Sequence, residues 1–172
     1  MKSITLKIIT RQLVDPMPPA RGEDTGLSLM EEEVAMARLI GPAPEPQEEE
    51  KLELVTQAVR EVTDDGEVKI SYVESELTGM NGTVTTIRYR RSEPQLVSIA
   101  RAGVFSSVIV LEKKKVHSTL YDMPGASLEM KIHTLDLDNR LDAEGKLRAD
   151  YVLRIGGEIT MRNKLSIEVM GG

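Results

Sequence analysis

Glu74 and Arg101 are charged residues that fall on the apolar face of two predicted strands. Glu74 continues the face of Ile70 within the alternating stretch 67–77, and Arg101 continues the apolar face of the stretch 95–101. Two opposite charges buried apart from each other are costly, whereas a buried pair is tolerated. We therefore predict that Glu74 and Arg101 lie close together inside the protein.

Further polar side chains are expected on the inside, near this pair. Buried polar groups need hydrogen-bond partners, so we expect Tyr121, Tyr151 or Asn163 to complete the hydrogen bonds of the pair. The predicted ligand-binding cluster consists of Tyr72, Glu74, Arg101, Tyr121, Tyr151 and Asn163. Two other roles stay open for it, since such a network could hold strands in register or take part in catalysis.

Glu74 and Glu76 are the carboxylates whose spacing suggests catalysis. Two residues apart on one strand face, they would have Cβ atoms about 7 Å apart, a separation that suits acid–base glycoside chemistry. Glu76 lies beside a predicted turn, so a hydrolase ranks below a binding protein and we assign no catalytic residue. The two histidines are dispersed and the chain has no cysteine, so we expect no metal site and no cofactor.

Short strands joined by turns must position these side chains. The stretch 4–14 alternates, and from residue 51 onward the chain reads as strand, turn, strand without a helix long enough for a parallel crossover. Asp64-Asp65-Gly66 and Pro124-Gly125 are turn signals. The pattern predicts one all-β domain over residues 1–172, an antiparallel barrel of about eight to ten strands.

Residues 15–50 interrupt this pattern. Six of the eight prolines lie there, around an apolar stripe at helical spacing that predicts a short helix over 28–40. The helix has three open roles: capping its own barrel, contacting a partner or forming a homodimer. The whole chain carries a net charge of −6, but residues 15–50 carry −8, so the acidity belongs to this insertion and the predicted barrel is slightly basic.

Composition limits the partners. The chain of 172 residues has no apolar run of about 18 residues and no apolar leader segment, so we expect a cytoplasmic protein without a membrane span. Arg88, Tyr89, Arg90 and Arg91 could stack bases and contact phosphates, but charges at a strand end more often discourage edge pairing. We do not expect nucleic-acid binding.

Several segments resemble one family in order and spacing. They are Tyr72 to Gly79, Gly82 to Thr86, Arg101 to Gly103, Tyr121 to Gly125, and the closing Tyr151 and Asn163. These segments are similar to the YwiB-like family of bacterial proteins of unknown function. The resemblance implies a calycin or lipocalin-like β-barrel and carries no established activity.

The residues and the resemblance together predict a non-enzymatic binding module for a small, partly apolar ligand in the barrel mouth. The alternative is a structural or protein-interaction module that uses the outer barrel face and the 28–40 helix.

Overall fold

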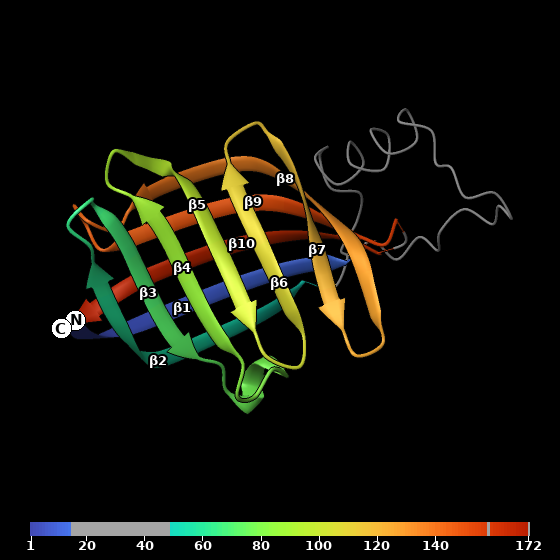
Figure 1. Ribbon diagram of the computed structural model, residues 1–172, viewed down its shortest axis with the longest axis horizontal. Coiled ribbons are helices and arrows are strands. Elements are labelled where there is room, and N and C mark those ends of the chain that lie inside the picture. Colours follow the sequence, from blue (N-terminus) through green and yellow to red (C-terminus); the bar gives the residue numbers. More distant parts are fainter. Residues whose placement is uncertain (15–48, 158, 172) are drawn as a thin grey trace, which may run out of the picture.

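The computed structural model describes residues 1–14, 49–157 and 159–171, and these form a closed antiparallel β-barrel (Figure 1). Neighbouring strands follow the chain order around the barrel, and β1 closes it by pairing with β10. The elements are β1 (Lys2–Val14), β2 (Glu50–Val62), β3 (Glu67–Val73), the 3-10 helix η1 (Glu76–Thr78), β4 (Val84–Arg90), β5 (Glu93–Ala102), β6 (Ser106–Glu112), β7 (Val116–Met123), β8 (Ala126–Arg140), β9 (Lys146–Ile155) and β10 (Ile159–Gly171). The predicted all-β barrel, consistent with a calycin-like fold, is therefore confirmed.

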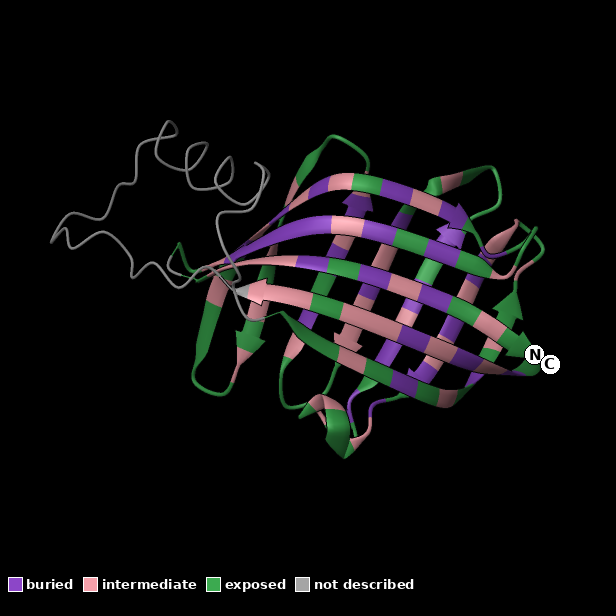
Figure 2. Cartoon of the chain, turned by 180° about the vertical axis from the view of Figure 1, so that it is seen from behind, coloured by how far each residue is buried: buried purple, intermediate pink, exposed green. Residues whose placement is uncertain are grey.

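Alternating burial along the strands creates the inside of the barrel (Figure 2). Successive side chains of a strand point to opposite faces, and strand register aligns the inward ones into rows. On β3 to β6 the first inward row is Val68, Tyr89, Val97 and Leu111. The next row consists entirely of isoleucines, Ile70, Ile87, Ile99 and Ile109. These two buried rows form one wall of the mostly aliphatic core that a chain with five aromatic residues requires.

The third row on this wall is polar. It contains Tyr72, Thr85, Arg101, Ser107 and Tyr121, each directly opposite the next on adjacent strands from β3 to β7. We call these five residues the polar row. The row lies near the end of the barrel where β3, β5 and β7 finish, whereas the apolar rows lie toward the chain termini. The barrel is thus filled at one end and presents polar side chains at the other.

The two turns predicted at Asp64-Asp65-Gly66 and Pro124-Gly125 are present, and their glycines have the backbone conformation expected of tight turns. Gly66 and Gly125 have φ angles of +83° and +81°, which side chains with a Cβ rarely adopt. One predicted boundary is wrong: the strand expected over 67–77 ends at Val73, because Glu76 to Thr78 turn into η1. The helix predicted over 28–40, and most of the 15–50 insertion, lie outside the described residues.

Candidate functional site: a cavity at the open end of the barrel

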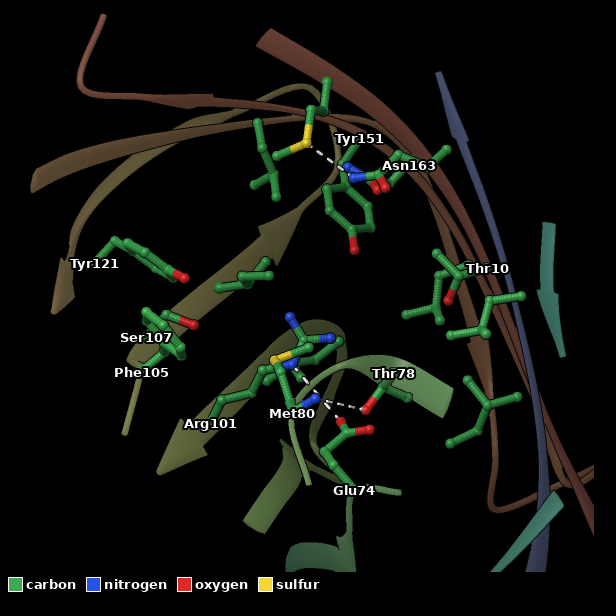
Figure 3. A pocket seen from close by; sticks show the side chains of 18 of the residues that line it. Thr10, Glu74, Thr78, Met80, Arg101, Phe105, Ser107, Tyr121, Tyr151 and Asn163 are labelled. Atoms are coloured by element: carbon green, nitrogen blue, oxygen red, sulfur yellow. Dashed lines mark hydrogen bonds and ion pairs between the residues drawn. The ribbon is translucent and has the colours of Figure 1, made fainter. Parts of the chain in front are cut away.

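A cavity of about 790 Å³ occupies the end of the barrel that carries the polar row. Most of its lining is aliphatic or thioether, with Ile87, Ile99 and Ile109 of the isoleucine row at its inner side. The polar side chains of the lining come from both walls (Figure 3). Pockets that bind small molecules commonly measure 300–1,000 Å³ and combine apolar walls with a few convergent polar groups. The cavity has the size and composition of a small-molecule site.

Glu74 is the buried acid of this cavity. Its side chain is only 2% exposed, and its Oε1 accepts a hydrogen bond of 2.6 Å from the Thr85 hydroxyl. The backbone holds it there, because the Glu74 amide donates to the Thr83 carbonyl at 2.8 Å just beyond the last β3–β4 ladder pair. The inward direction of Ile70 and Tyr72 therefore continues to Glu74 after β3 has ended.

Arg101 faces Glu74 from β5. Its Nε lies 3.8 Å from Glu74 Oε1, which confirms the predicted proximity of the two charges. The distance is that of an ion pair and exceeds that of a hydrogen bond, so the buried Nε has no hydrogen-bond acceptor among the described residues. The side chain is 31% exposed. Arg101 therefore contributes a charge that Glu74 balances. It also contributes an Nε–H donor that bonds to no described residue.

Two tyrosines flank the charged pair. Burial, reinforced by the negative charge of Glu74, raises the pKa of Tyr72 well above its ordinary value. Burial also raises the pKa of Tyr151, and the nearby Arg101 charge offsets part of that effect. Both side chains are consequently neutral hydroxyls at physiological pH. Figure 3 shows Tyr151 on the wall opposite Glu74, with its hydroxyl directed into the cavity.

A second polar row lies on the wall formed by β8, β9, β10 and β1. It consists of Thr134, Tyr151, Asn163 and Gln12, again directly opposite one another. Asn163 lines the cavity, is 4% exposed, and its Nδ2 has no hydrogen-bond partner among the described residues. An unpaired buried amide donor is costly, so the Asn163 Nδ2 is a polar group of this wall that no described residue satisfies.

The rim of the cavity is built from turns. The segment around η1 contributes Leu77, Thr78 and Met80, and the Met80 amide approaches the Thr78 hydroxyl at 3.4 Å. On another side Phe105 stacks against Tyr121, with ring centroids 6.3 Å apart and an interplanar angle of 13°. The rim therefore presents apolar side chains to anything entering.

All six residues predicted for the ligand site line this cavity: Tyr72, Glu74, Arg101, Tyr121, Tyr151 and Asn163. The predicted hydrogen bonding is wrong in one respect, because Thr85 donates to Glu74 in place of Tyr121, Tyr151 or Asn163. Sequence reasoning also missed Ser107 and Gln12. Thr85 could have been found from its alternation with Ile87, which places its hydroxyl on the inner face.

Two arrangements considered from the sequence are not formed in the structure: a pair of catalytic carboxylates, and a basic cluster with a base-stacking tyrosine. Glu76 begins η1 and is exposed, whereas Glu74 is buried at the end of the preceding strand, so the two carboxylates do not form the expected pair on one strand face. Tyr89 is 3% exposed and points into the core, so it cannot stack a base between the neighbouring arginines. Arg90 and Arg91 instead approach Asp65 and Asp142, at 3.7 Å and 3.3 Å.

Two further features bear on the kind of site. In the described part of the chain, no group of three or more His, Asp or Glu side chains could hold a metal ion. The same residues contain no helix that is long and apolar enough to cross a membrane.

Comparisons with known proteins place the chain in a family. The model of a domain of unknown function, DUF1934, matches residues 42–167. No curated protein matches the chain. The crystal structure of the YwiB protein from Bacillus subtilis is similar, with a TM-score of 0.59 and 15% sequence identity over 99% of this chain and 93% of that one. This likeness supports the fold, and the family match spans most of the sequence. The chain therefore belongs to the DUF1934 family of unknown function, in agreement with its resemblance to YwiB-like proteins.

Proposed function

We propose that this protein is a non-enzymatic binding module that holds a small, partly apolar molecule in the cavity of its barrel. The observation that carries the proposal is the cavity of about 790 Å³, whose walls are mostly apolar and whose polar residues include members of two opposed rows. Burial of apolar surface supplies roughly 25 cal/mol per Å² of contact, and a few polar groups orient the ligand. The six cavity-lining residues Tyr72, Glu74, Arg101, Tyr121, Tyr151 and Asn163 are the proposed contacts.

Binding fits the residues better than catalysis does. The buried acid of the cavity, Glu74, already accepts a hydrogen bond from Thr85 and balances the Arg101 charge, which does not favour it as a catalytic base. The second carboxylate that a glycosidase mechanism needs is not supplied by Glu76, which is exposed in η1. A role in orienting Arg101 accounts for Glu74 without a reaction.

A neutral fluorescent probe tests the proposal. N-phenyl-1-naphthylamine becomes bright in apolar surroundings, and we expect its emission to rise and saturate with the wild-type protein. Ile109→Trp would place a large side chain into the cavity and should abolish saturable binding. The matched control is Val108→Trp on the same strand, since Val108 points outward and is 41% exposed. Equal binding by both variants, or no binding by the wild type and by a broader ligand screen, would contradict the proposal.

A second candidate function is interaction with another protein through the outer barrel face. Val108 and Leu120 are 41% and 59% exposed, and the Thr119 hydroxyl bonds to the Val108 carbonyl, so these apolar side chains lie on adjoining strands. Such a patch favours self-association. Light scattering should then show a homodimer that Val108→Lys with Leu120→Lys dissociates, and a wild-type monomer at high concentration would rule out the homodimer.

A further inference from the structure

The cavity holds an ion pair of zero net charge, in which Glu74 is buried and Arg101 is partly exposed. Among the described residues that line it, the charged ones are Glu50, Lys51, Glu74 and Arg101, two acids and two bases. Glu50 and Lys51 are exposed at the start of β2, whereas Glu74 and Arg101 face each other at 3.8 Å inside the cavity. A ligand that reaches the polar row therefore meets an arginine whose charge is already balanced.

Several hydrogen-bond donors in the cavity are available to a ligand. The buried Nε of Arg101 has no hydrogen-bond partner among the described residues, and neither has the buried Nδ2 of Asn163. The Tyr151 hydroxyl adds a donor directed into the cavity. Glu74, the main acceptor, is 2% exposed and receives the Thr85 hydroxyl. The polar surface of the cavity thus offers N–H and O–H groups to an acceptor on the ligand.

An anionic ligand would fit these donors but not the charge. A carboxylate brought to Arg101 also approaches Glu74, and two like charges at close range in a poorly solvated site repel strongly. A carbonyl oxygen accepts the same hydrogen bonds without adding charge. Resting on the proposed function, we infer that the cavity selects neutral amphipathic molecules that carry a carbonyl-type acceptor, such as an amide or ketone on an aliphatic body, and discriminates against the corresponding carboxylates.

Glu74 is the residue that sets this selectivity. In Glu74→Gln the shape is kept and an amide oxygen still accepts from Thr85, but the Arg101 charge loses its counter-charge. A carboxylate should then gain affinity because it meets an uncompensated guanidinium. The neutral ligand should change little, since its hydrogen bonds are retained.

Decanamide and decanoate provide a matched pair of probes with the same chain and planar heads of similar size. Their affinities follow from displacement of N-phenyl-1-naphthylamine at pH 8, where decanoate is ionised. In the wild type we expect decanamide to bind at least about tenfold more tightly than decanoate. This affinity ratio is comparable to the effect of one charge-assisted hydrogen bond. In Glu74→Gln we expect this ratio to fall by about tenfold or to reverse.

Asn163→Leu provides a second test that does not depend on the charged pair. Leucine removes an unpaired donor, so the variant without ligand should be as stable as the wild type or more stable in urea. Its affinity for decanamide should fall about three- to tenfold, whereas binding of the fluorescent probe, which has no carbonyl, should persist. Unchanged decanamide binding by Asn163→Leu would remove Asn163 from the recognition of the carbonyl.

The outcomes separate the inference from the proposed function. If decanoate binds the wild type as tightly as decanamide, or if Glu74→Gln leaves the ratio unchanged, the selectivity is wrong while the binding function stands. If the fluorescent probe and both decanoyl probes fail to bind the wild type at all, the proposed function and the inference fall together.

Discussion

Arg101 Nε lies 3.8 Å from Glu74 Oε1 although β4 separates β5, which carries Arg101, from β3, which ends just before Glu74. Thr85 of β4 stands between them, directly opposite Arg101 in the ladder and 2.6 Å from Glu74 through its hydroxyl. A buried carboxylate thus receives one neutral hydrogen bond and one opposite charge, both supplied by neighbours in the polar row. The free energy of the site depends on these two interactions together.

Thr85→Val removes the hydroxyl that donates to Glu74 and keeps the side-chain shape. We expect a loss of about 1–3 kcal/mol in the free energy of unfolding, because the buried carboxylate then lacks its hydrogen-bond donor. Urea denaturation measures the loss. Thr86→Val is the matched control, since Thr86 is half-buried on the outer face and contacts the Ser71 hydroxyl at 3.1 Å. Equal costs for the two variants would show that the carboxylate does not depend on Thr85.

Asn139 links β8 to β5 by hydrogen bonds at the filled end of the barrel. Its Nδ2 donates to the Pro94 carbonyl at 2.8 Å, its Oδ1 accepts from the Leu141 amide at 3.1 Å, and its backbone bonds to Gln95, which joins β8 to β5. Asn139→Ala should cost about 2–3 kcal/mol, because buried backbone groups lose their partners. The exposed Asn81 in the β3–β4 connection provides the control, and Asn81→Ala should cost less than about 0.5 kcal/mol in the same urea titration.

Gly103 has no room for a side chain. A Cβ there would lie 2.5 Å from Thr83 Oγ1 and 3.1 Å from Thr83 Cβ. Thr83 is buried and its carbonyl accepts from the Glu74 amide, so Gly103→Ala should displace the backbone that positions Glu74. We expect a loss of about 1–3 kcal/mol in stability together with weaker probe binding. Ala102→Ser, at the exposed neighbouring residue, should leave both measurements unchanged.

Tyr89 makes the stability of the fold sensitive to alkaline pH. Burial, followed by the charge of Asp142, raises its pKa to about 12. An unfolded tyrosine ionises near pH 10, so its contribution is complete below about pH 10 and is lost as the pH rises toward 12. The wild type should lose more stability than Tyr89→Phe between pH 9 and pH 11, by up to about 1 kcal/mol.

The same comparison at neutral pH serves as the control for Tyr89. The Tyr89 hydroxyl has no hydrogen-bond partner among the described residues, so Tyr89→Phe should be within about 1 kcal/mol of the wild type at pH 7. Parallel loss of stability in both proteins at high pH would assign the alkaline sensitivity to other groups.

Alternation along single strands made most of the barrel predictable. A side-chain period of two assigns each residue to the inside or the outside without knowledge of its neighbours. That rule placed Tyr72, Arg101, Tyr151 and Asn163 in the interior, and turn residues such as Gly66 located the hairpins. The rule failed at Glu76, because a strand ends where the backbone turns, and alternation carries no information about that point.

The sequence by itself determined the all-β class, the inward residues and the presence of a charged pair among them. Only the tertiary structure decided that Thr85, and not a tyrosine, donates to Glu74, that Asn163 has an unpaired donor, and that a cavity of about 790 Å³ remains between the two polar rows. The physical reason is that partners and volumes depend on the register between strands and on closure of the barrel. Both join residues far apart in the chain, and no local pattern records them.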